Sequence, residues 1–91
     1  MRKYKWLFIR RRKIKKQDIY NTIGKNIQKY RKIKGIKQHD LAQGIFLSDS
    51  FIAKLESKTR QTISIDTLEQ IADFLEVDIT VFFDKSVFKT K

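Results

Sequence analysis

The 91-residue sequence contains no cysteine and no proline, and it has only three glycines and one histidine. Without cysteine, a disulfide framework and thiolate catalysis are excluded, which suits a reducing cytoplasm. One histidine and no metal-ligand spacing predict neither a metal centre nor an enzyme. No cofactor or small-molecule ligand is indicated. The absence of proline and the scarcity of glycine favour a helical chain with few irregular loops.

Long hydrophobic runs are also missing. The longest apolar run near the N-terminus covers residues 6–9, far too short for a signal peptide or a membrane span. Hydrophobic residues make up 41% and charged residues 34% of the chain, which suits a globular protein rather than a disordered one. We therefore expect one small cytoplasmic domain with a single modest core.

Positive charge is abundant and unevenly distributed. The net charge of +11 divides into +8 for residues 1–22, +6 for residues 23–60 and −3 for residues 61–91. A basic half and an acidic half predict an anionic partner at the basic end, either nucleic acid or an anionic membrane. The plain alternative is a solvated basic face without a partner.

Apolar periodicity predicts an all-α fold. Ile23, Ile27, Tyr30 and Ile33 recur at helical spacing after the possible caps Asn21 and Thr22, and Leu68, Ile71, Ala72 and Leu75 form a second buried stripe. Gly35 is suited to end the first helix. We expect five helices, over residues 22–34, 38–44, 48–56, 65–75 and 79–84.

The starts of the later helices share one pattern, a cap residue flanked by two apolar residues that pack across the first turn. Ser48, Ser64 and Asp78 are good caps in this pattern, whereas Lys37 occupies the cap position of the second helix. From the middle two helices, five apolar side chains are expected to face inward: Leu41, Ala42, Ile45, Ile52 and Leu55.

That arrangement leaves Gln38 and the face made by Asp49, Ser50, Ala53 and Lys54 exposed at the starts of their helices. Short polar side chains on a projecting helix N-terminus are what the major groove of DNA can accept. The sequence therefore predicts a DNA-reading face on helix 48–56.

The segments that carry these features resemble the lambda-repressor-like, Cro-type (xenobiotic-response-element) regulators. The likeness spans residues 22–84, and the residues that match the family's helix-turn-helix are Gln38, Leu41, Ala42, Leu47, Ser48, Ile52, Leu55 and Glu56. "VDITVFF" also resembles the end of small restriction-modification controller proteins. The resemblance implies a five-helix domain of prokaryotic or phage type that forms a homodimer and binds operator DNA.

Three residues depart from the family pattern. Phe46 stands where the turn usually has glycine, so either the turn is reshaped or Gly44 absorbs the bend. Lys37 stands where the family usually has a Thr or Ser cap, so the capping bond is lost but a positive charge that can bind phosphate is added. Asp49 suits the helix macrodipole but is repelled by phosphates, which leaves the sequence preference at that position open.

We assign site roles by side-chain chemistry. Gln38 and Ser48 are expected to bind phosphate, Ser50 and Lys54 to read base edges, and Phe51 either to touch a thymine methyl or to join the core. Four flanking cations are predicted phosphate contacts: Lys34, Lys37, Lys58 and Arg60. The predicted DNA-binding residues are all of these together with Asp49. His39 is expected to be exposed, without a partner in the sequence and without a catalytic role.

The resulting prediction is a transcriptional regulator, a repressor or autoregulator, that binds double-stranded DNA. Residues 1–21 would form a basic arm, residues 22–84 the domain and residues 85–91 a tail. The arm's "RRRKIKK" can lie on DNA, while its "YKWLFI" can join a core, a second subunit or a membrane interface.

The dimer contact is predicted at Val81, Phe82, Phe83 and Phe88. The rival interpretations are an antitoxin-like protein-interaction module that also binds its own operator, and a peripheral membrane protein.

Overall fold

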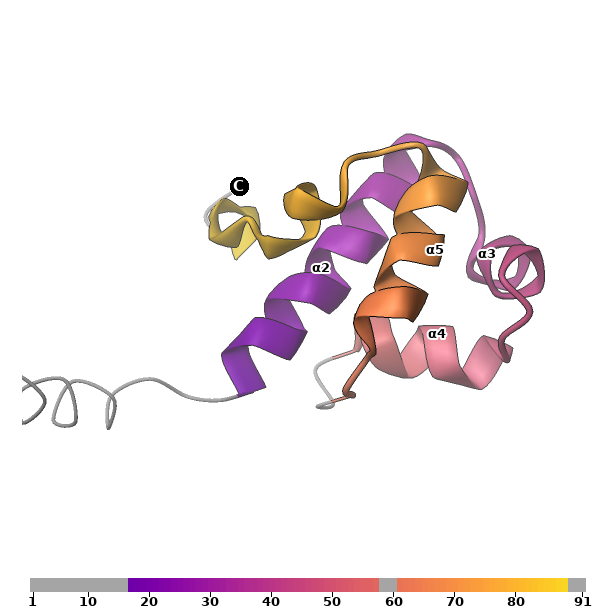
Figure 1. The fold of residues 1–91 in the computed structure, drawn as a ribbon, viewed down its shortest axis with the longest axis horizontal. Coiled ribbons are helices and arrows are strands. Elements are labelled where there is room, and N and C mark those ends of the chain that lie inside the picture. The colour runs from indigo at the N-terminus through magenta and orange to yellow at the C-terminus, as the bar shows by residue number, and fades with distance from the viewer. Residues whose placement is uncertain (1–16, 58–60, 89–91) are drawn as a thin grey trace, which may run out of the picture.

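The computed structural model describes residues 17–57 and 61–88. Within these residues the structure is entirely helical, which confirms the predicted fold class. The elements are α2 (Gln17–Ile33), α3 (Gln38–Gly44), α4 (Asp49–Glu56), α5 (Ile65–Leu75) and two 3-10 helices, η1 (Ile79–Phe83) and η2 (Lys85–Phe88). Figure 1 shows η1 and η2 along α2, and α3 and α4 at the other end of the domain. In the described segments no helix is long and apolar enough to cross a membrane.

Three of the five expected helices lie within one residue of their predicted ends, but the first and last differ. α2 begins at Gln17, five residues before the predicted start and within the segment assigned to the basic arm. The fifth helix is a short 3-10 helix rather than an α-helix, and a second one follows it. The "RRRKIKK" and "YKWLFI" segments of the arm lie outside the described residues.

α2 is bonded to the C-terminal segment through Asn26. Asn26 is 1% exposed, and its side-chain amide donates to the carbonyl oxygens of Phe82 at 3.0 Å and Asp84 at 2.9 Å. The same amide lies 3.0 Å from the carbonyl oxygen of Thr22, which is also buried. Asn21 and Thr22, the residues expected to cap this helix, lie inside α2 instead.

The hydrophobic core joins α2, α3, α4, α5 and η1. Its buried members are Ile23, Ile27, Leu41, Ala42, Ile45, Ile52, Leu55, Leu68, Ile71, Ala72, Leu75 and Phe82. All five side chains expected to face inward from α3 and α4 are buried, as is the predicted stripe of α5. Two expectations were wrong. Ile33 is 64% exposed, and Phe82, expected at a dimer contact, is fully buried in the core.

The predicted caps are confirmed at three helix starts. Ser48 and Ser64 each accept a backbone N–H three residues on, both at 3.1 Å, and Asp78 accepts the N–H of Thr80 at 2.9 Å. Lys37, in contrast, makes no side-chain capping bond to α3. α3 therefore depends on its neighbours for stability, since a seven-residue helix is too short to persist alone.

Two carboxylates stabilise the 3-10 turns at the C-terminal end as anions. The Thr80 backbone N–H lowers the pKa of Asp78, and the Ser86 backbone N–H, 2.9 Å away, lowers the pKa of Asp84. A folded-state pKa below the ordinary value means that this stabilisation is present at neutral pH and is lost as the pH falls through the folded-state value.

Two glycines within helices permit close approaches that the sequence analysis missed. A Cβ atom on Gly24 would lie 1.7 Å from the carbonyl oxygen of Leu55, so α2 and α4 cross in contact only because the side chain is absent. A Cβ on Gly44 would lie 2.1 Å from the Phe74 ring of α5. Glycine in a helix costs about 1 kcal/mol relative to alanine. The close contacts explain why glycine, despite this cost, occupies both positions.

The turn between α3 and α4 keeps a Schellman geometry with phenylalanine at its left-handed residue. Phe46 has φ +60°, its N–H donates to Gln43 O at 3.2 Å, and the Leu47 N–H donates to Ala42 O at 2.8 Å. Gly44 stays within α3, so it does not absorb the bend. The Phe46 side chain is 92% exposed and gains almost no burial in return for its backbone strain.

Phe46→Gly is expected to raise the free energy of unfolding by about 0.5–1 kcal/mol, because glycine relieves a left-handed strain of about 1–2 kcal/mol at a smaller entropic cost. Urea denaturation measures this change. The matched control is Phe46→Ala, which removes the exposed ring but keeps the Cβ atom. Equal stabilisation by both variants would show that the ring, and not the backbone, causes the strain.

Candidate nucleic-acid interface

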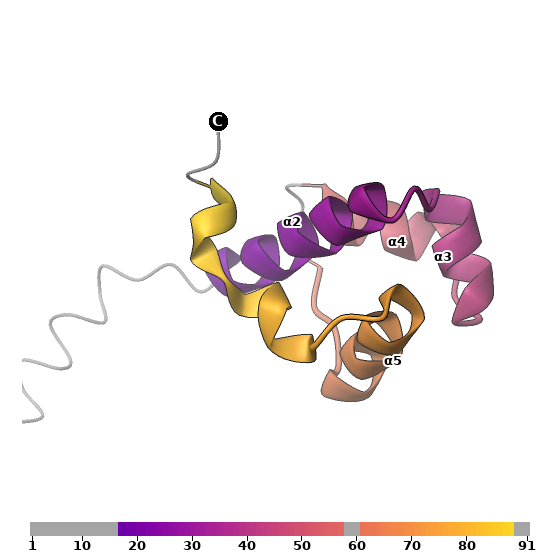
Figure 2. The same cartoon turned by 90° about the horizontal axis from the view of Figure 1, so that it is seen from above.

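α3 and α4 pack against each other and meet at the turn formed by residues 45–48. Figure 2 shows α4 lying near α2, which is its other packing partner. α4 has only eight residues, so its direction depends on these two contacts rather than on its own stability.

The predicted reading face is exposed. Asp49, Ser50, Ala53 and Lys54 are all exposed on α4, at spacings that place them on adjoining parts of one helix face. Ser48 caps the helix, so its oxygen is already bonded to the Phe51 N–H. Phe51 is half-buried and packs against the core, which favours the core alternative for this side chain.

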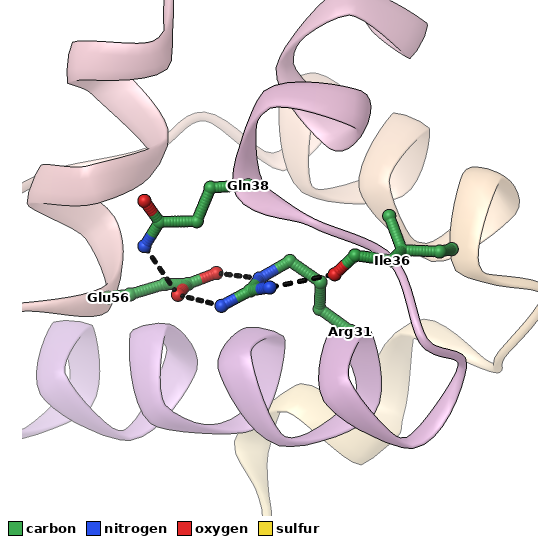
Figure 3. Close-up of polar contacts among 4 residues, drawn as sticks. All are labelled: Arg31, Ile36, Gln38 and Glu56. Atoms are coloured by element: carbon green, nitrogen blue, oxygen red, sulfur yellow. Dashed lines mark hydrogen bonds and ion pairs between the residues drawn. The ribbon is translucent and has the colours of Figure 1, made fainter.

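A buried ion pair anchors the start of α3 and the end of α4 to α2 (Figure 3). Arg31 donates from Nε to Glu56 Oε2 and from Nη2 to Glu56 Oε1, both at 2.7 Å. The two side chains are 8% and 2% exposed. Arg31 Nη1 also donates to the carbonyl oxygen of Ile36 at 2.7 Å, and Gln38 Nε2 donates to Glu56 Oε1 at 2.9 Å.

This cluster, which we name the clamp (Arg31, Ile36, Gln38 and Glu56), was not predicted as a unit. Gln38 was expected to bind phosphate, and the clamp uses one of its two amide N–H groups. Glu56 entered the sequence analysis only as part of a family pattern. A carboxylate following the apolar stripe of α4, together with an arginine near the end of α2, was the signal available to find the pair.

His39 has a partner, contrary to the sequence-based expectation. Its Nδ1 lies 2.9 Å from Asp49 Oδ2 and 3.0 Å from Asp49 Oδ1. The pair joins the first turn of α3 to the first residue of α4, and the two side chains are 59% and 61% exposed. His39 is indeed exposed, as expected, but it holds the carboxylate at the tip of the predicted reading helix.

A family model described as a helix-turn-helix domain matches residues 24–86. The chain belongs to the helix-turn-helix domain family. This confirms the resemblance drawn from the sequence. The chain is 36% identical over 62 residues to the HTH-type transcriptional regulator SlrR of Bacillus subtilis (strain 168), a match that covers 68% of this chain and 41% of SlrR.

Two solved structures resemble this helix-turn-helix domain, both of the restriction-modification controller protein C.Esp1396I. The wild-type structure has a TM-score of 0.64 at 32% identity and covers 78% of this chain and 90% of the controller. A point mutant has the same TM-score at 35% identity, covering 78% and 87%. The fold likeness therefore extends over nearly the whole controller chain.

Cations border the helix-turn-helix. Lys34 and Lys37 are exposed in the connection between α2 and α3. Lys58 and Arg60, the other two predicted phosphate contacts, lie outside the described residues. α5 carries Asp66, Glu69 and Asp73 on exposed positions and no basic residue. The described surface is thus basic beside α3 and acidic along α5.

Arg31→Met is expected to lower the free energy of unfolding by about 3–5 kcal/mol, because it leaves the Glu56 carboxylate buried without its cation. The double variant Arg31→Met/Glu56→Met should cost less than this single change, since no unpaired charge remains. Urea denaturation of both variants measures the difference. Additive losses would mean that the two side chains act independently.

Proposed function

We propose that this protein is a transcriptional regulator that binds double-stranded operator DNA by placing α4 in the major groove. The observation that carries the proposal is the clamp, which anchors α4 at its C-terminal end while its N-terminal turn presents small and polar side chains outward. SlrR is named a transcriptional regulator and C.Esp1396I a controller protein, which supports the same role here.

The residue roles divide by position and chemistry. Ser50 and Lys54 are exposed on α4 and suit base edges, with Lys54 directed toward guanine. Gln38 retains one amide N–H, and Ser48 lies at the start of α4, where phosphate binding is favoured. The flanking cations complete the backbone contacts: Lys34, Lys37, Lys58 and Arg60.

We further infer that the protein acts in the cytoplasm as a homodimer, without a cofactor and without a chemical reaction. One small reading helix contacts too few bases for high specificity, which favours two half-sites. Phe83 is 38% exposed and Val81 is half-buried, so both stay candidates for the predicted dimer contact. The side chain of Phe88, also predicted there, lies outside the described part of the structure. The basic arm, residues 1–21, is proposed to add further phosphate contacts.

Selection of bound duplexes from a random pool is the direct test of the proposed function. The expected result is an enriched site with two inverted half-sites, together with a dimeric mass at micromolar concentration in sedimentation equilibrium. Enrichment of no sequence would refute operator binding. An enriched site without symmetry, bound by a monomer, would refute the dimer alone.

Substitutions at two lysines distinguish a residue that reads bases from one that contacts only phosphate. Lys54→Ala is expected to relax base preference and cost about 1–3 kcal/mol on the selected site, because a base contact is lost. Lys37→Ala is the matched control: it should weaken specific and random duplexes alike, because a phosphate contact carries no sequence information. Binding measured on both duplexes at one salt concentration distinguishes them. Equal losses for the two variants would remove Lys54 from the base-reading set.

A further inference from the structure

The first residue of α4 is an aspartate, an unfavourable choice for a surface that approaches phosphates. Asp49 is 61% exposed, and the other carboxylate of α4, Glu56, is buried in the clamp. Asp49 is therefore the one α4 carboxylate placed to meet DNA. Its repulsion by the phosphate backbone needs a compensating contact or a bonding partner on the DNA itself.

His39 supplies the compensating contact. The Nδ1 atom lies almost equally far from both carboxylate oxygens, at 2.9 and 3.0 Å, so a single N–H is shared between them. Because His39 lies on α3, the contact fixes the carboxylate from outside its own helix. It opposes free rotation of the Asp49 side chain, which would otherwise have several rotamers open to it.

The shared bond leaves the carboxylate able to accept further hydrogen bonds. An ionised carboxylate has about four lone-pair sites, and the shared His39 N–H occupies at most one on each oxygen. In the major groove, guanine N7 and O6 and thymine O4 are acceptors and repel a carboxylate, whereas cytosine offers its N4 amino group. Adenine also has an amino group, but its neighbouring N7 acceptor would face the second carboxylate oxygen.

We propose that His39 and Asp49 form one recognition unit, in which His39 positions the Asp49 carboxylate to accept a hydrogen bond from cytosine N4 in the major groove. The proposal rests on the proposed DNA-binding function and names a base that the operator contains. Asp49 is the base-contacting residue, and His39 is a positioning residue that acts through it.

The alternative role for the pair is purely structural. An exposed polar contact such as this one between α3 and α4 contributes little to stability, and many contribute nothing measurable. A structural pair would weaken binding to all duplexes by one factor, in step with any fall in the melting temperature. A recognition unit would instead change the base preference at one position of each half-site. The two roles therefore differ in their effect on base preference, which a change in stability alone does not alter.

The experiment compares four full-length proteins: the wild type, Asp49→Ala, His39→Ala and His39→Asn. Each selects duplexes from a random pool, and dissociation constants are then measured on the wild-type site with each base in turn at the position under test. Asn is the conservative variant because its side-chain amide retains an N–H donor. Circular dichroism and the melting temperature establish that each variant is folded.

The wild type is expected to prefer cytosine at one position of each half-site by about 5- to 150-fold. Asp49→Ala should lose that preference and leave the position read by Lys54 unchanged. His39→Ala should reduce the cytosine preference several-fold, and His39→Asn should restore much of it.

Three results would overturn the recognition unit. The first is an unchanged base preference in Asp49→Ala, and the second is an unchanged preference in His39→Ala. The third is a uniform loss over all duplexes that follows the melting temperature. In each of these cases the wild type still enriches a site, so the proposed function stands. If the wild type enriches no site, both proposals fall together.

Discussion

The buried Arg31–Glu56 ion pair is the constraint on which the arrangement of the helix-turn-helix depends. Removing two charges from water costs several kcal/mol per ion, and the cost is offset only when geometry and additional hydrogen bonds are good. Both conditions hold here: the pair is bidentate at 2.7 Å, and Glu56 receives a third bond from Gln38. Because Arg31 also bonds the Ile36 carbonyl, one side chain sets the relative positions of α2, the following loop and α4.

Two sets of contacts then fix the position of α4, one in the core and one at its exposed first turn. The core side chains Ile52 and Leu55 hold the helix against its neighbours, and Gly24 lets α2 approach the carbonyl of Leu55. The Ser48 cap and the His39–Asp49 contact act at the other end, on the exposed turn. An eight-residue helix that would be unstable alone is thus held at both ends, which is a requirement for presenting side chains in fixed geometry.

Sequence periodicity predicted the elements whose ends are marked by local sequence signals. α3, α4 and α5 were located within one residue because apolar spacing marks all three and a serine cap precedes α4 and α5. The contact of Asn26 with carbonyls more than 50 residues away was missed, because no local pattern encodes it. The glycine contacts and the clamp were missed for the same reason. The exposed reading face was predictable, whereas the partner of His39 required the distance between two helices.

The charges of α4 suit both its own stability and its proposed chemistry. Asp49 lies in the first turn and Lys54 in the last, the arrangement that the helix macrodipole favours at each end. An acceptor at the first turn suits the cytosine amino group, and a donor at the last turn suits guanine O6 and N7. Under the proposed function, one short helix therefore carries the two complementary groups that distinguish the strands of a G·C-containing site. Under the same proposal, the aspartate at the start of α4 sets a base preference of its own, because the His39 contact offsets the repulsion that an isolated carboxylate would meet.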